Sequence, residues 1–252
     1  TDYAQSAAVF SIQDEEITYA QNIYQRMYPA STTKILTAYL ALKYGNLDDV
    51  LTVSSDAVNT LMSGSSICGL KPGDQLTLDQ ALYGLMLCSG NDAANVIAEY
   101  ISGSTDKFAE LMNKEAQALG ATSSHFVNPH GLPDDNHYTT AYDLYLIFNE
   151  CIKHDDFVKI INSSSYTAHI TGADGTKRDV KWEPTNYYAK GEATPPDNVT
   201  IIGGKTGTTK GAGNCLILLT KDSSGNPYIS IIMGAGSKPL LYQDMTSMLS
   251  KI

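Results

Sequence analysis

The stretch Pro29-Ala30-Ser31-Thr32-Thr33-Lys34 leads into an almost unbroken apolar run, Ile35 to Leu42, and its position decides how the rest of the chain is interpreted. The pattern predicts a helix from Ser31 to Tyr44. Because apolar side chains fall on nearly every face of that helix, it should be buried rather than lie on the surface. Residues three positions apart share one helix face, so Ser31 and Lys34 should lie one turn apart.

A serine and a lysine in this arrangement can act as a nucleophile and its base. A serine hydroxyl is a weak nucleophile until a neighbouring group accepts its proton. Lys34 can accept that proton only as a neutral amine, which requires burial or a nearby cation to lower its pKa. The free N–H groups at the helix start also favour negative charge near Ser31. Taken alone, however, the pair more often marks a helix-capping serine followed by a surface lysine.

Ser89-Gly90-Asn91 lies at a break between two predicted helices. Ser89 could transfer protons there, and Asn91 could hydrogen-bond a substrate amide. The simpler interpretation is a turn in which Asn91 caps the following helix.

Lys205-Thr206-Gly207-Thr208 falls in a predicted strand. Lys205 supplies a cation and the two threonines supply hydroxyl groups. Gly207 would allow another segment to approach the strand closely. On its own, such a segment is equally typical of an exposed strand.

The order of the predicted elements favours an α+β fold, in which strands from both termini form one antiparallel sheet with flanking helices and an inserted helical lobe. We expect a single domain, residues 1–252, with a sheet lobe at about 1–28 and 163–252 and a helical lobe at about 29–162. The predicted elements are a hairpin at 7–20, a helix after the capping pair Thr77 and Gln80, helices at 92–100, 105–119, 140–152 and 240–249, a strand at 200–209 and a hairpin at 215–233.

Composition excludes some classes of function. The net charge of −10 disfavours nucleic-acid binding, because the chain cannot neutralise phosphates. No run of 18 apolar residues is present, so we expect no membrane-spanning helix in this sequence. No basic and then apolar signal segment is seen at its start.

The four cysteines, Cys68, Cys88, Cys151 and Cys215, fit no zinc-binding pattern. Buried free thiols are the simpler interpretation. A single bridge is the alternative, and Cys68 with Cys88 is the candidate pair because both lie near segments assigned to the active site.

Together and in this order, the three motifs match the S-x-x-K, S-D-N and K-T-G signature of β-lactamases and penicillin-binding proteins. With Ser-Gly-Asn as its second motif, the chain resembles the low-molecular-mass D-alanyl-D-alanine carboxypeptidases. The resemblance covers about residues 7–240. The segments that carry it are Tyr28 to Lys34, Gly64 to Ser66, Leu70 to Asp74, Ser89 to Ala94, Phe126 to Leu132, and Gly204 to Gly207.

The resemblance implies a role for each motif residue. Ser31 would be acylated and Lys34 would be its general base. Ser89 and Asn91 would relay the proton and orient the substrate. Lys205 would keep Lys34 neutral and attract the substrate carboxylate. Thr206 and Thr208 would bind that carboxylate beside Gly207. The backbone N–H groups of Ser31 and Thr208 would form the oxyanion hole.

It also implies partners and a location. The substrate would be a peptidoglycan stem peptide ending in D-Ala-D-Ala, and β-lactams would be covalent inhibitors. No cofactor, metal or nucleic acid is expected. The enzyme would act outside the cytoplasm, and any membrane contact would come from parts beyond this chain, such as the C-terminal β domain and amphipathic helix of many relatives.

Some residues depart from the family pattern. Thr208 stands where some relatives carry a histidine. The carboxylate-binding arginine of some relatives has no clear match, and Arg178 and Lys190 are weak candidates. The histidines at 125, 130 and 137 lack the carboxylate spacing of a metal site, so we expect structural roles for them.

Two alternative functions remain open. A class A β-lactamase needs a glutamate-positioned water, but Phe126 to Leu132 occupies the segment where that glutamate is expected. A penicillin-binding sensor would be acylated by the antibiotic and would leave cell-wall peptides uncut.

Overall fold

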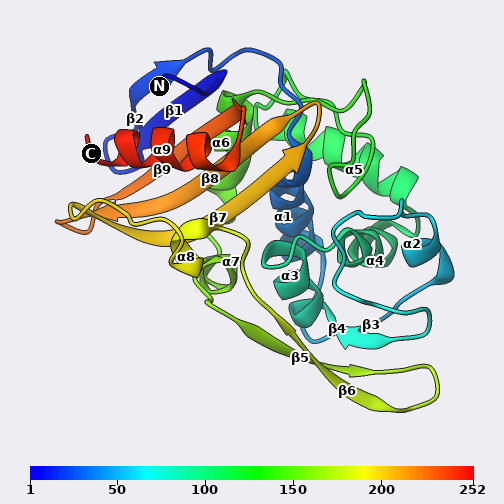
Figure 1. Ribbon diagram of the computed structural model, residues 1–252. Coiled ribbons are helices and arrows are strands. Elements are labelled where there is room, and N and C mark those ends of the chain that lie inside the picture. Colours follow the sequence, from blue (N-terminus) through cyan, green and yellow to red (C-terminus); the bar gives the residue numbers. More distant parts are fainter.

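The computed structural model describes all residues, 1–252, and its central feature is a five-stranded antiparallel sheet built from both ends of the chain (Figure 1). The strand order is β2-β1-β9-β8-β7, and every neighbouring pair is antiparallel. The strands are β1 Ser6–Ser11, β2 Glu16–Gln21, β7 Val199–Thr209, β8 Gly213–Asp222 and β9 Pro227–Ala235. The predicted sheet and both predicted hairpins are therefore confirmed.

The middle strands of this sheet are apolar on both faces because helices cover each side. On β8, Leu216 and Leu218 pack with α9 (Lys238–Leu249), whereas Ile217 and Leu219 belong to the larger core on the other face. Helix α6 (Ala141–Cys151) contacts β1 and β9 on that second face. In Figure 1, α9 lies in front of the sheet and α6 lies behind it.

Helix α1 (Lys34–Tyr44) runs through the centre of the helical part of the molecule, and every residue from Lys34 to Ala41 is buried. This confirms the predicted buried helix. Its first turn is a tighter 3-10 turn, η1 (Ala30–Thr33), so Ser31 precedes the α-helix proper. The helices around it are α2 Ser55–Asn59, α3 Leu78–Met86, α4 Asn91–Ser102, α5 Thr105–Ala118, α7 Asp155–Ile161 and α8 Tyr187–Lys190.

The predicted cap of α3 is present, and one core extends through both lobes. Thr77 and Gln80 form the predicted capping box at the start of α3. One cluster of buried side chains runs from Ala8 on β1 through the helices to Met233 on β9, so the sheet and the central helices share a core. None of the helices combines the length and the apolar character needed to cross a lipid bilayer.

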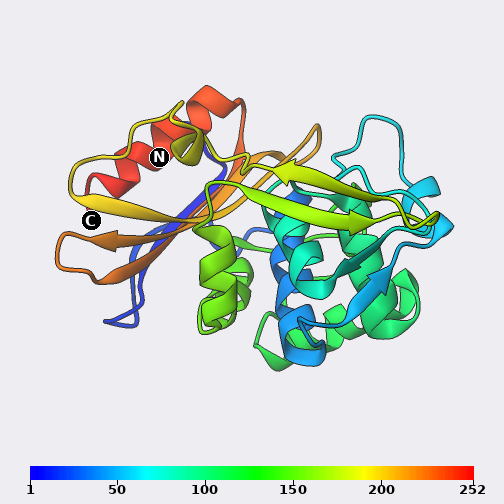
Figure 2. The ribbon, with the colours of Figure 1, turned by 90° about the horizontal axis from the view of Figure 1, so that it is seen from below.

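A second sheet corrects part of the predicted boundary. Its order is β3-β4-β5-β6, with β3 Val50–Thr52, β4 Gln75–Thr77, β5 Tyr166–Thr171 and β6 Lys177–Trp182. Residues from 163 onward were expected in the main sheet, but the β5–β6 hairpin lies along the helical part instead (Figure 2). Tyr166 stacks on Tyr83 of α3 at 3.8 Å between ring centroids. This aromatic contact holds the β5–β6 hairpin against α3. The alternation of residues in β5 predicts a strand but does not indicate which distant segment that strand packs against.

Candidate active site

Ser31 sits on η1, and two glycines let other segments approach this turn. Gly207 on β7 faces it so closely that a Cβ atom would lie 2.8 Å from Ser31 N, and a Cβ on Gly131 would lie 1.8 Å from Ala30 O. Ala30 itself has φ 51°, a conformation that L-residues rarely adopt and that surrounding contacts must maintain. The turn is thus held between β7 and the loop before α6, while Ser31 stays partly exposed.

Lys34 is completely buried directly behind Ser31. Its Nζ lies 3.0 Å from Ser31 Oγ, 2.7 Å from Asn91 Oδ1 and 2.8 Å from the backbone oxygen of His130. The last two partners can only accept hydrogen bonds. A neutral amine has two N–H groups, so when both are donated to these oxygens its lone pair is left facing the Ser31 hydroxyl.

The surroundings of Lys34 favour that neutral form. Burial, followed by the charge of Lys205, holds the pKa of Lys34 well below its ordinary value. An amine in this environment can accept the proton of Ser31, as the sequence predicted from burial and a second cation.

Asn91 does not have the capping role that the simpler interpretation gave it. Gly90 is the N-cap residue of α4, and Asn91 is the first helical residue. Its side-chain oxygen accepts a hydrogen bond from Lys34. The carboxamide Nδ2 has no hydrogen-bond partner within the protein and is not sealed in the interior, so it can donate to a ligand.

Lys205 and Ser89 form a second pair across the site. Lys205 Nζ donates to Ser89 Oγ at 3.0 Å and to the Thr206 backbone oxygen at 2.8 Å. Burial lowers the pKa of Lys205 to about 7. Ser89 has φ 58°, again a strained backbone position at a site where its hydroxyl must be aimed.

A pocket of about 140 Å³ opens above these groups. Five predicted residues line it: Ser31, Ser89, Thr206, Gly207 and Thr208. The other three, Lys34, Asn91 and Lys205, are buried and reach the lining residues through the hydrogen bonds described above. The structure therefore brings together every residue of the three motifs that was assigned to the site.

Comparison with known proteins identifies the family. A model of the D-alanyl-D-alanine carboxypeptidase family, peptidase S11, matches residues 2–237. The chain belongs to this family. The predicted resemblance is thereby confirmed.

Individual members of the D-alanyl-D-alanine carboxypeptidase family match over most of the chain. DacF of Bacillus subtilis is 31% identical over 98% of this chain and 61% of its own length. DacC of Escherichia coli is 31% identical over 91% of this chain and 56% of its own length. The chain thus spans about three fifths of the length of these curated relatives.

A solved structure with a similar fold supports the assignment of the fold. The crystal structure of the Streptomyces K15 DD-transpeptidase superposes with a TM-score of 0.89 at 29% identity, covering 98% of this chain and 95% of that one. The predicted α+β fold with an inserted helical lobe is confirmed by this match.

Several pocket residues were missed by the sequence interpretation. They are Ser66, Thr185, Tyr187, Cys215, Lys238, Leu241 and Tyr242. Ser66 lies in a segment that carries the family resemblance, which could have pointed to it. The ring of Tyr187 stacks on Tyr242 at 4.5 Å, joining α8 to α9, and no local pattern indicates such a contact.

Arg178 and Lys190, the weak candidates for binding a carboxylate, do not line the pocket. Arg178 pairs with buried Asp74 at 2.6 Å on the second sheet, and Lys190 lies 3.4 Å from Glu192. Lys238, at the start of α9, is instead the lysine that lines the pocket beside Thr206 and Thr208. Both earlier candidates are therefore wrong, because tertiary contacts direct their charges elsewhere.

Each of the three histidines makes a hydrogen bond within the protein, and two of them contact the segment that carries Ser31 and Lys34. The backbone oxygen of His130 accepts from Lys34, and burial lowers the pKa of its imidazole to about 3. His137 lies 2.8 Å from Thr33 Oγ1 on η1, and burial lowers its pKa to about 4. His125 Nδ1 contacts the Asn136 backbone oxygen at 2.5 Å. His130 and His137 are neutral at pH 7 and support the turn that carries Ser31.

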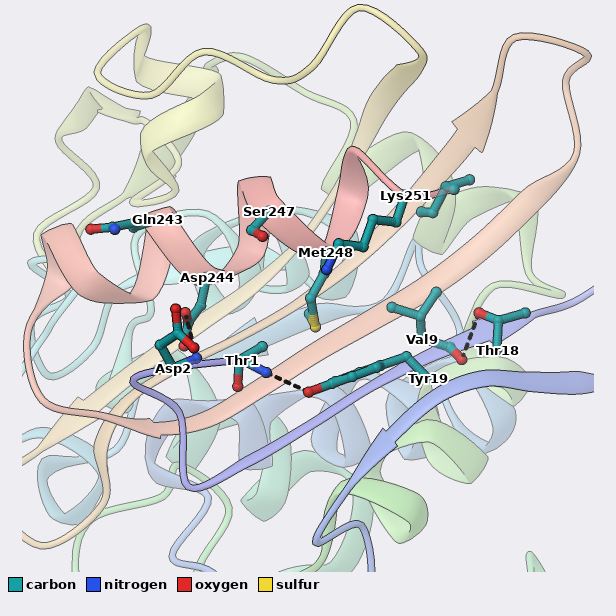
Figure 3. Close-up of a pocket in the computed structure, with 11 residues that line it drawn as sticks. Thr1, Asp2, Val9, Thr18, Tyr19, Gln243, Asp244, Ser247, Met248 and Lys251 are labelled. Carbon is teal, nitrogen blue, oxygen red and sulfur yellow. Dashed lines mark hydrogen bonds between the residues drawn. The ribbon is translucent and has the colours of Figure 1, made fainter.

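A separate pocket of about 280 Å³ lies between the C-terminal half of α9 and the β1–β2 hairpin (Figure 3). Asp244, one of the two aspartates that line it, accepts hydrogen bonds from the backbone N–H groups of Asp2, Tyr3 and Ala4. These bonds anchor the first residues to α9. The pocket contains none of the motif residues.

Proposed function

We propose that this chain is a serine-type D-Ala-D-Ala carboxypeptidase that removes the terminal D-alanine from peptidoglycan stem pentapeptides through a Ser31 acyl-enzyme. The observation that carries the proposal is the position of Lys34 Nζ, fully buried and 3.0 Å from Ser31 Oγ. Membership of a family whose relatives are named D-alanyl-D-alanine carboxypeptidases supports the choice of substrate.

In the acylation step, Ser31 Oγ bonds to the carbonyl carbon between the two D-alanines and its proton passes to Lys34 Nζ. The backbone N–H groups of Ser31 and Thr208 donate to the developing oxyanion, where each donor typically contributes roughly 3 kcal/mol. Gly207 supports this role because its missing side chain lets β7 approach the Ser31 amide. The C–N bond then breaks, and the departing amine takes its proton through Lys34 and Ser89.

Recognition of the terminal carboxylate falls to the β7 side of the pocket. Thr206 and Thr208 supply hydroxyl groups, and Lys205 supplies a positive charge from its buried position beneath the pocket lining. Lys238 adds a second cation at the pocket wall, in place of the arginine expected from relatives. Asn91 Nδ2 donates to the substrate amide and fixes the scissile bond over Ser31.

In deacylation, water attacks the carbonyl carbon of the ester and gives one proton to Lys34. Lys34 passes that proton to Ser31 Oγ as the bond between the acyl carbon and Oγ breaks. No carboxylate lines the pocket, so a glutamate-held water of the class A β-lactamase kind has no counterpart. A β-lactam would acylate Ser31 in the same way and leave slowly. The lack of a carboxylate among the residues that line the pocket therefore argues against a β-lactamase.

The deciding experiment measures D-alanine release from an N-acyl-L-Lys-D-Ala-D-Ala peptide. Wild type should release it, and Ser31→Ala should release none while Ser247→Ala, on α9, behaves as wild type. The same preparation is treated with a fluorescent penicillin and followed by intact mass. Acylation without peptide cleavage would replace the proposal by a penicillin-binding sensor, and rapid penicillin turnover would replace it by a β-lactamase.

A transpeptidase is a specific second candidate, because the matched Streptomyces structure is named a DD-transpeptidase. The two activities share the acyl-enzyme and differ in the acceptor, water or an amine. Adding glycine as an acceptor amine and measuring the ratio of hydrolysed to aminolysed product separates them. We expect hydrolysis to dominate.

The remaining assignments follow from this substrate. A cell-wall peptide is met outside the cytoplasm, in the periplasm or at the outer face of the membrane, so we place the enzyme there. The core shared between both lobes supports residues 1–252 as one catalytic domain.

A further inference from the structure

Two thiols meet beside the active site. Cys68 Sγ lies 3.1 Å from Cys88 Sγ, and neither forms a disulfide. Cys68 is buried and Cys88 is half-buried. The other two cysteines have separate environments, since the thiol of Cys151 donates to the Ile35 backbone oxygen and Cys215 lies on β8. Only one pair in the chain is therefore placed for a bond.

The pair joins two segments that form the pocket wall. Cys88 directly precedes Ser89, and Cys68 follows Ser66 by two residues; both serines line the pocket. The backbone already couples these segments, because Asn91 N–H donates to the Ser66 oxygen at 2.9 Å. A bond between the sulfur atoms would link the same two segments covalently.

The backbone of Cys68 is held in place by hydrogen bonds at both its N–H and its carbonyl oxygen. The carboxylate of buried Asp92 accepts its backbone N–H at 2.8 Å, and its backbone oxygen accepts from Trp182 Nε1 at 3.1 Å. A Cβ atom on Gly90 would lie 2.1 Å from Cys68 Sγ. The glycine in Ser-Gly-Asn is thus matched to Cys68, since an aspartate side chain there would collide with the thiol.

We propose that Cys68 and Cys88 form a reversible disulfide, made by exchange with a small-molecule disulfide, that fixes Ser89 in its strained active position. The bond is expected outside the cytoplasm, where disulfides persist. Its formation depends only on the thiol geometry. Its effect on acylation rests on the proposed function.

The exchange takes two balanced steps. The Cys88 thiolate, the more exposed of the two, attacks one sulfur of the oxidant and releases one thiolate. Cys68 then loses its proton and attacks the Cys88 sulfur, which forms the protein disulfide and releases the second thiolate. Two protein thiols are oxidised, the oxidant disulfide is reduced, and the two protons end on the released thiols. Burial raises the pKa of the Cys68 thiol, which suits it to the second step rather than the first.

The first test counts thiols. Wild type is equilibrated with oxidised glutathione, denatured, alkylated and mapped by peptide mass. We expect two thiols to be lost as a 68–88 crosslink while Cys151 and Cys215 remain free. The crosslink should also raise Tm by roughly 5–10 °C, because it closes a loop in the unfolded chain. Four free thiols, a different pair, or a lasting glutathione adduct on Cys88 would overturn the proposal.

The second test measures acylation by a fluorescent penicillin before and after reduction. Reduction should slow wild type roughly threefold or more, because small displacements of catalytic groups are costly. Cys88→Ser should be insensitive to the oxidant, and Cys151→Ala should respond as wild type. An equal rate in both wild-type redox states would overturn the link to Ser89 even if Cys88→Ser failed to fold. Absence of acylation in both states would instead count against the proposed function and leave the thiol count to decide the bond.

Discussion

Lys205 Nζ donates a hydrogen bond to Ser89 Oγ at 3.0 Å, although the two residues stand 116 positions apart in the chain. The contact links β7 of the sheet to the turn before α4. It places a second cation near the buried amine of Lys34, and this charge contributes to the lowered pKa of Lys34. The main consequences of this arrangement can each be tested.

Acylation should show a bell-shaped dependence on pH. Lys34 must be neutral to accept a proton, so the rate rises as Lys34 deprotonates, well below its ordinary pKa. Lys205 must be charged to attract the carboxylate, so the rate falls as pH passes its pKa of about 7. The measurement is the second-order rate with a penicillin between pH 5 and 10. Lys205→Arg should remove the alkaline decline, and a wild-type rate that keeps rising to pH 10 would contradict the assignment.

Replacing the base should abolish acylation without unfolding the protein. In Lys34→Ala the rate should fall by roughly 10³-fold, within the range typical of a lost general base. Lys153→Ala, which removes only an exposed pair with Glu150, is the matched control. Retention of more than a tenth of the wild-type rate in Lys34→Ala would show that another group accepts the proton.

Gly207→Ala should impair acylation more than binding. The added Cβ would lie 2.8 Å from Ser31 N and must displace either β7 or η1. We expect a loss of roughly 10²-fold in kcat, because a misplacement of about 1 Å is enough for that. Gly211→Ala on the same hairpin is the control, since its Cβ would meet Tyr28 at an ordinary 3.6 Å. Equal activity of the two variants would argue against an oxyanion hole at this contact.

Lys238→Ala should weaken recognition of the substrate carboxylate. Comparing kcat/KM for a peptide with a free terminal carboxylate and for its amide isolates this charge. The carboxylate peptide should lose roughly tenfold and the amide little, because only the former pairs with the ammonium group. Lys251→Ala, just beyond the other end of α9, should affect neither substrate. A uniform loss on both would indicate a structural role for Lys238.

Arg178→Ala should reduce stability and leave substrate recognition intact. Asp74 is buried, with 2% of its side chain exposed, and would lose its bidentate partner at 2.6 and 2.9 Å. Removing one member of a buried pair typically costs about 3 kcal/mol or more, which chemical denaturation measures. An unchanged unfolding free energy combined with a raised KM would restore Arg178 as a carboxylate ligand.

The sequence anticipated what depends on local pattern. The apolar run after Lys34 predicted the buried helix, and Thr77 with Gln80 predicted the capping box. It did not anticipate that β5 and β6 join a second sheet, because alternation identifies a strand without naming its partner. It left open whether Asn91 caps a helix or serves the site, since only the tertiary position of Lys34 reveals the hydrogen bond that its side-chain oxygen accepts.

The sequence by itself determined the three motifs, their residue types and their order, and so the chemistry that they can perform. Tertiary structure alone decided that Lys34 is sealed from water, that Lys205 reaches Ser89, and that Lys238 rather than Arg178 faces the pocket. The reason is physical. A side chain's functional groups are fixed by its identity, whereas its pKa and its partners depend on burial and on charges brought close by segments distant in the chain.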